Sequence, residues 1–127
     1  MQVDLNGLRA LVTGSTSGIG RATAQKLASC GAEVIVNGRS PGTVDAAVAE
    51  LRSAGRKAAP AVGDLSTAEG CQLVIDQAGE LDILVNNAAW IGFKPAFEIP
   101  DEDWIRSFEV NVLAGVRLTR HYGPRDE

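Results

Sequence analysis

A glycine-rich stretch at residues 13–20 follows the apolar run 8–12 and precedes a segment with helical spacing of apolar residues. This context predicts a tight turn between a strand and a helix. Gly14 permits the turn, Gly18 lets backbone N–H groups approach a ligand, and Gly20 allows close helix–strand packing. Helix N-termini favour anions. We therefore predict a pyrophosphate-binding turn, with a ligand-free turn as the alternative; its residues are Gly14, Ser15, Thr16, Ser17, Gly18, Ile19 and Gly20.

Two later motifs occur with this turn in a fixed order. One is the stretch LDILVNNAA at residues 81–89, and the other is Asn111 within SFEVNV at residues 107–112. Together with the Thr-Gly-x-x-x-Gly-x-Gly spacing they resemble the short-chain dehydrogenase/reductase family over about residues 5–122. The resemblance implies that Asn87, Ala88 and Ala89 border the cofactor ribose and that Asn111 belongs to the active site. Ala89 replaces the usual glycine, and its methyl group is expected to lower cofactor affinity without preventing binding.

The end of the second predicted strand indicates which cofactor is preferred. A NAD-preferring site places a carboxylate there, which hydrogen-bonds the ribose hydroxyls and would repel a 2′-phosphate. Here Gly38 stands where relatives commonly carry the acid, and Arg39 follows it. A guanidinium can pair with phosphate through two hydrogen bonds, so NADP(H) is predicted over NAD(H). The alternative is a solvated Arg39 on the surface.

Asp64 and Leu65 follow the third predicted strand. The resemblance places an aspartate here beside the adenine, so Asp64 is a candidate partner of the base's amino group and Leu65 a candidate neighbour. A plain helix-approach residue is an equal alternative for Asp64.

The family's hydride transfer between nicotinamide and a carbonyl or alcohol carbon uses a tyrosine acid/base with a lysine four residues later, and a serine that polarises the substrate oxygen. Tyr122 is the single tyrosine, and Asp126 stands four residues after it. The lysines Lys26, Lys57 and Lys94 have no tyrosine four residues before them. The resemblance therefore implies the cofactor-binding half of an NADP(H)-dependent oxidoreductase, acting on a small carbonyl or alcohol substrate only when completed. Alternatives are a non-catalytic dinucleotide-binding or oligomerisation module and, more weakly, a response-regulator-like domain.

Apolar periodicity divides the chain into alternating strands and helices without a composition break. The second helix is expected to start at Ser40 and Pro41 and to stop at Gly55, and Ser66 is expected to cap the third. Along the first helix, Ala22, Lys26 and Leu27 are expected on the inner side. The predicted strands span residues 8–12, 33–37, 58–63 and 83–85, and the other predicted helices span residues 19–30, 66–78 and 101–122.

Four such β-α units with right-handed crossovers predict an α/β fold, a doubly wound parallel Rossmann-type sheet in a single domain over residues 1–127. By analogy with the family, the strand order is 3-2-1-4 and the sheet is truncated before a fifth strand. An unpaired fourth strand and an apolar stripe on the last helix, which includes Trp104 and Phe108, predict a homodimer or higher homo-oligomer. The two aromatic residues could instead be local core.

Composition excludes several classes of partner. The net charge is −4, with 45% hydrophobic and 22% charged residues, which gives no basic patch for nucleic acid or for a membrane surface. No apolar run reaches the roughly 20 residues needed to span a bilayer, and the first residues lack the pattern of a signal peptide. Cys30 and Cys71 have no metal-ligand spacing, so we expect no metal site and two small buried thiols in a reducing cytoplasm.

Overall fold

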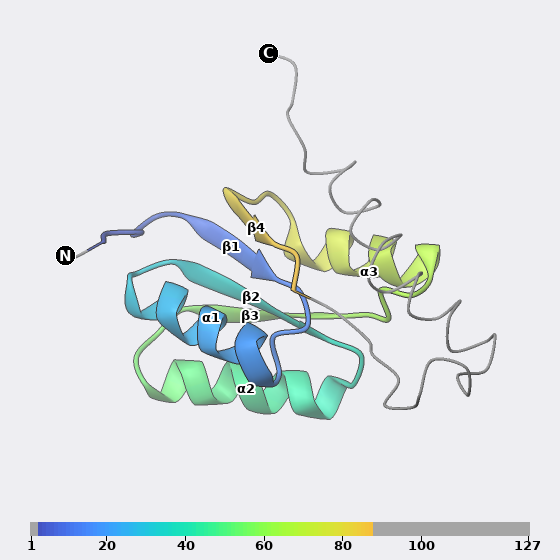
Figure 1. The fold of residues 1–127 in the computed structure, drawn as a ribbon, viewed down its shortest axis with the longest axis horizontal. Helices are drawn as coiled ribbons and strands as arrows, with labels where there is room; N and C mark the ends of the chain where they lie inside the picture. Colours follow the sequence, from blue (N-terminus) through green and yellow to red (C-terminus); the bar gives the residue numbers. More distant parts are fainter. Residues whose placement is uncertain (1–2, 88–127) are drawn as a thin grey trace, which may run out of the picture.

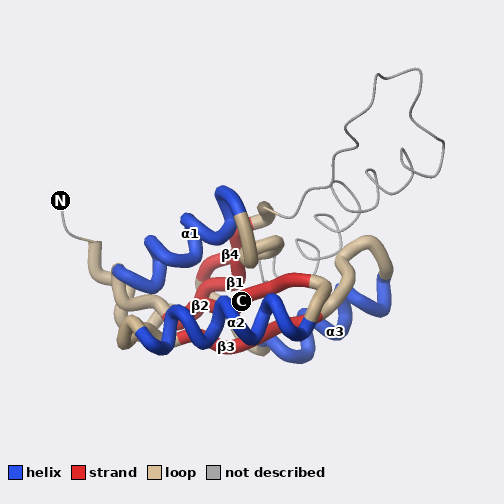
Figure 2. The backbone as a smooth tube through the Cα atoms, turned by 90° about the horizontal axis from the view of Figure 1, so that it is seen from below, coloured by secondary structure: helices blue, strands red, loops and turns tan. Residues whose placement is uncertain are grey.

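The computed structural model describes residues 3–87, which form a parallel four-stranded sheet with helices on both faces (Figure 1). The strand order is β3-β2-β1-β4, as predicted, and Figure 2 shows the strands in this sequence. The predicted loop and helix after residue 87 lie outside the described residues. The elements are β1 (Arg9–Val12), α1 (Gly18–Ser29), β2 (Glu33–Gly38), α2 (Pro41–Ser53), β3 (Ala58–Val62), α3 (Ala68–Ala78) and β4 (Ile83–Val85).

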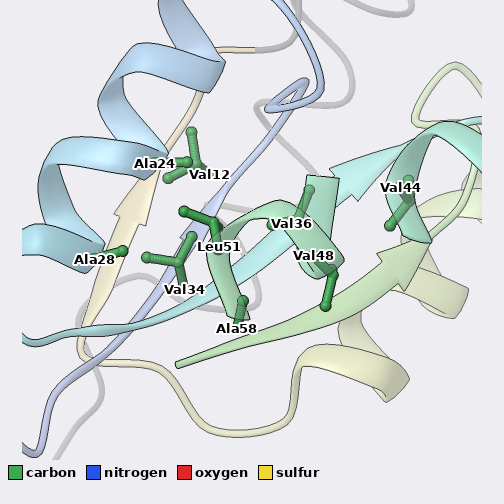
Figure 3. Close-up of a cluster of buried hydrophobic side chains, with 9 residues drawn as sticks. All are labelled: Val12, Ala24, Ala28, Val34, Val36, Val44, Val48, Leu51 and Ala58. Carbon is green, nitrogen blue, oxygen red and sulfur yellow. The ribbon is translucent and has the colours of Figure 1, made fainter. Parts of the chain in front are cut away.

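The two faces of the sheet bury separate apolar clusters, because successive side chains of a strand point to opposite faces. On one face, the strands pack against α1 and α2 (Figure 3). On the other face, Leu11 and Ile35 pack against Val74 and Ala78 of α3. This double coverage explains the continuous apolar run of β2 and confirms the doubly wound arrangement. The first cluster consists of Val12, Ala24, Ala28, Val34, Val36, Val44, Val48, Leu51 and Ala58.

Three local predictions were wrong in detail. Ala22 and Lys26 are exposed, because α1 buries every fourth residue counted from Gly20, namely Gly20, Ala24 and Ala28. The N-cap of α3 is Thr67 rather than Ser66. Thr67 Oγ1 accepts the N–H of Gly70 at 2.9 Å, whereas Ser66 bonds back to the residue two positions before it. The two cysteines also depart from the prediction that both are buried, since Cys71 is buried and Cys30 is only half-buried.

The outer edge of β3 is closed by side chains. Gln77 of α3 donates to the carbonyl of Val62 at 2.7 Å and accepts the N–H of Val62 at 2.9 Å. Arg52 Nε donates to the carbonyl of Ala58 at 3.0 Å, and Pro60 between them has no N–H to offer. These backbone groups are already hydrogen-bonded and are not available to pair with a further strand, so this edge is protected from strand addition.

Candidate functional site

The turn between β1 and α1 lies where the parallel strands end. Gly14 and Gly18 both have φ of +60°, a conformation that glycine adopts without strain. A Cβ atom on Gly20 would lie 2.4 Å from both the Gly14 carbonyl oxygen and Asn87 Nδ2. Each glycine therefore meets a backbone requirement of the turn. The close packing predicted for Gly20 is observed.

Asn37, at the end of β2, fixes the first half of this turn. Its Oδ1 accepts the N–H of Gly14 at 2.9 Å, and its Nδ2 donates to the Ala61 carbonyl of β3 at 3.1 Å. Its backbone N–H donates to Ser15 Oγ at 2.9 Å and its carbonyl accepts the Ser15 N–H at 2.9 Å. Asn37 and Ser15 are 2% and 1% exposed. These buried groups are paired with each other, so they position the turn.

The end of β4 holds the turn from its other side. The N–H of Asn87 donates to Thr13 Oγ1 at 2.8 Å, and Asn87 Nδ2 donates to the Gly14 carbonyl at 3.3 Å. The N–H of Thr13 in turn donates to the Val85 carbonyl at 3.0 Å. The structure thus brings Asn87, from a motif more than 70 residues away in sequence, against the glycine-rich turn.

The start of α1 offers hydrogen-bond donors to an anion. The first helical bond runs from the N–H of Arg21 to the Ser17 carbonyl, so the N–H groups of Gly18, Ile19 and Gly20 have no acceptor within the helix. Ser17 makes no side-chain cap, and no acidic residue lies in the first turn. These donors and the positive end of the helix fit a diphosphate, which carries negative charge and only acceptors at its outer oxygens.

Charges near this helix start are already balanced by pairing. Arg21 of α1 donates to both carboxylate oxygens of Glu50 of α2 at 2.6 Å, and Gln25 adds a bond at 3.1 Å. The hydrogen bond to Glu50 and its charge raise the pKa of Arg21, and the same contacts lower the pKa of Glu50. This pair joins the two helices on one face of the sheet, and it directs Arg21 towards α2.

Gly38 is the last residue of β2, and Arg39 follows it beside the turn. Arg39 is exposed and makes no ion pair with any residue in the range 3–87. Within that range no carboxylate pairs with its guanidinium, whose N–H groups can therefore donate to a phosphate. The solvated alternative is compatible with the same observation.

The residues after β3 have structural partners of their own. Asp64 Oδ1 accepts the N–H of Ser66 at 2.9 Å and its Oγ at 2.7 Å, which shapes the approach to α3. The Leu65 side chain is 5% exposed and belongs to the core under α3. The helix-approach role of Asp64 is thus observed, and contacts of Asp64 and Leu65 with adenine remain predictions.

Three of the expected site residues, Ala88, Ala89 and Asn111, lie outside the described residues. Within residues 3–87, no cluster of histidine, cysteine and acidic side chains could hold a metal ion. No helix in the same part is long and apolar enough to cross a bilayer. Sequence reasoning missed Asn37 as a site residue. The signal was a polar residue that continues a β-branched run, where burial demands hydrogen-bond partners.

Comparisons with known proteins agree with this geometry. A family model described as short chain dehydrogenase matches residues 9–125. The oxidoreductase YvaG of Bacillus subtilis is 51% identical over 96% of this chain and 47% of its own length. Gluconate 5-dehydrogenase of Gluconobacter oxydans is 38% identical over 95% of the chain and 50% of its own. The chain thus spans about half the length of these curated relatives.

A solved structure gives the same picture in three dimensions. L-sorbose reductase from Gluconobacter frateurii, complexed with NADPH and L-sorbose, superposes with a TM-score of 0.88 at 34% identity. The match covers 96% of this chain and 48% of the reductase. This chain therefore shares its fold with the part of the reductase that it matches.

Proposed function

The chain belongs to the short-chain dehydrogenase family, and we propose that it binds NADP(H) as the cofactor-binding part of an oxidoreductase. The proposal depends above all on the start of α1, where the N–H groups of Gly18, Ile19 and Gly20 have no helical acceptor. These groups, with the turn residues Thr16 and Ser17, are proposed to hold the diphosphate. The similarity to a reductase complexed with NADPH supports the choice of cofactor class.

The remaining contacts are assigned to the ends of the other strands. Arg39 is proposed to pair with the 2′-phosphate, because it is exposed and unpaired among residues 3–87. Asp64, which follows the carboxyl end of β3, is proposed to accept a hydrogen bond from the adenine amino group. Leu65, Asn87, Ala88 and Ala89 complete the proposed contacts.

The bound cofactor would supply or accept the hydride in reversible carbonyl reduction. The chain's own part is to bind and orient it, and Asn111 is proposed to belong to the active site. The sequence holds no tyrosine with a lysine four residues later, and Asp126 follows Tyr122 at that spacing. We therefore expect this chain alone to bind the dinucleotide without turning over a substrate.

A non-catalytic binding or oligomerisation module is the second candidate, and the same missing pair favours it. Both candidates predict that this chain alone leaves NADPH unconsumed when it is incubated with aldehydes and ketones, so turnover would contradict the expected inactivity and exclude the non-catalytic module. Self-association is proposed separately, and sedimentation of the chain at micromolar concentration tests it.

Titration with NADPH tests the binding proposal. Ile19→Glu places a negative charge beside the free N–H groups, at a side chain that is 78% exposed. An acid in the first turn favours the helix itself, so folding should be retained while the diphosphate is repelled. We expect at least about a tenfold loss of affinity. The control is Leu73→Glu on α3, also an exposed apolar residue, which should bind as wild type; equal affinities of the two variants would contradict the proposal.

A further inference from the structure

The last residue of β2 has no room for a side chain. A Cβ atom built on Gly38 would lie 2.9 Å from the Cγ2 methyl group of Thr16 and 2.9 Å from that of Val44. Carbon atoms at their optimal separation are about 3.5 to 4.0 Å apart. Any residue other than glycine at position 38 must therefore displace a methyl group of the turn or of α2.

Neither methyl group can move without consequence. Both belong to β-branched side chains, which have few χ1 rotamers. Val44 is fully buried and packs in the cluster under α1 and α2. Thr16 follows Ser15, and two hydrogen bonds hold Ser15 to Asn37. The Asn37 N–H donates to Ser15 Oγ, and the Ser15 N–H donates to the Asn37 carbonyl. A new side chain at position 38 would disturb the core or shift the turn.

Position 38 also matters for selectivity, because a NAD-preferring site carries its ribose-binding carboxylate at the end of this strand. We infer that Thr16 and Val44 are specificity-determining residues, which restrict position 38 to glycine. Because these two residues exclude a carboxylate at position 38, no negative charge there repels a 2′-phosphate bound beside Arg39. This inference rests on the proposed function. It assigns to Thr16 of the turn and to Val44 of the core a role in selectivity that requires no contact with the ribose.

The steric part can be measured without any dinucleotide. Thermal unfolding is compared for Gly38→Ala in the wild-type chain and in a Thr16→Ser/Val44→Ala background, which lacks both Cγ2 methyl groups. We expect Gly38→Ala to lower Tm by about 5 °C in the wild-type chain and by clearly less in that background. Equal shifts in the two backgrounds would overturn the inference.

The selectivity part compares Kd for NADH and NADPH. Gly38→Asp alone should weaken the binding of both dinucleotides, since the new side chain displaces the turn. In the Thr16→Ser/Val44→Ala background, Gly38→Asp should change the NADPH-to-NADH preference by at least about tenfold towards NADH. An equal change from Gly38→Asp alone would overturn the inference. If the wild-type chain binds neither dinucleotide, the proposed function fails and the selectivity claim fails with it. If Gly38→Ala lowers Tm equally in the two backgrounds, only the role of Thr16 and Val44 is removed.

Discussion

The side-chain oxygen of Asn37 accepts the backbone N–H of Gly14 at 2.9 Å, across 23 positions of sequence. This bond joins the end of β2 to the first glycine of the β1–α1 turn. The nitrogen of the same amide donates to the Ala61 carbonyl, so one side chain connects the turn with two strands. The orientation of the amide is fixed by its partners, because one is a donor and the other an acceptor.

Asn37→Ala is expected to destabilise the fold by about 2 kcal/mol, because it leaves the Gly14 N–H without its acceptor and removes the bond from the buried amide to the Ala61 carbonyl. The relaxed turn should also lower the affinities for NADPH and NADH by the same factor, since both dinucleotides carry the same diphosphate. Urea unfolding and titration with each dinucleotide measure these effects. As a control, Gln72→Ala removes an exposed amide that bonds Asp76, and it should change neither quantity appreciably. A change in the ratio of the two affinities would argue against a role in positioning the turn.

Arg39→Ala, in contrast, should change the ratio of the NADPH and NADH affinities. Loss of the guanidinium removes a charge-assisted pair with the 2′-phosphate, so NADPH affinity should fall by about tenfold or more while NADH affinity hardly changes. Calorimetric titration measures both. Arg56→Ala removes an equally exposed arginine at the opposite ends of the strands and serves as the control. Equal NADPH and NADH affinities in the wild-type chain would reject the preference for NADP.

The Arg21–Glu50 pair predicts a dependence of stability on pH. Because the pKa of Glu50 is lowered in the folded chain, its contribution is present above the ordinary carboxyl value near 4.5 and is lost as the pH falls through the lower folded value. The raised pKa of Arg21 keeps that group charged throughout this range. Urea unfolding should show a difference between wild type and Glu50→Gln at pH 7 that shrinks in acid. A difference independent of pH, or one matched by Asp45→Asn, would contradict this explanation.

Gln77→Ala is expected to open the outer edge of β3, because Val62 loses the partners of its N–H and carbonyl groups. We expect a loss of about 1 kcal/mol and more association at high concentration. Unfolding and light scattering test the two effects. Gln72 lies on the same helix and its side chain, among residues 3–87, bonds only the Asp76 side chain, so Gln72→Ala controls for the change in composition. An unchanged scattering profile for Gln77→Ala would show that the edge needs no such protection.

Particular residues show how far the sequence alone could lead. The β-branched run of β2 and the positions of Gly14, Gly18 and Gly20 predicted the strand, the turn and the close packing of α1 at Gly20, because these depend on local conformation and burial. The buried face of α1 was not predicted correctly, since Ala24 and Ala28 lie inside rather than Ala22 and Lys26. The strand order came from the resemblance to a family, since pairing between distant strands has no local signal. The hydrogen-bond partners of Asn37 and Gln77 could not be predicted, because they lie on other elements of the fold. The choice of Thr67 over Ser66 as N-cap depended on Asp64, which competes for the Ser66 hydroxyl.

A crystal of the chain soaked with NADP⁺ tests the central claim most directly. We predict diphosphate oxygens within hydrogen-bonding distance of the N–H groups of Gly18, Ile19 and Gly20, with the Asn37–Gly14 bond intact. A dinucleotide bound elsewhere, or an empty turn in an otherwise unchanged chain at saturating NADP⁺, would contradict the account.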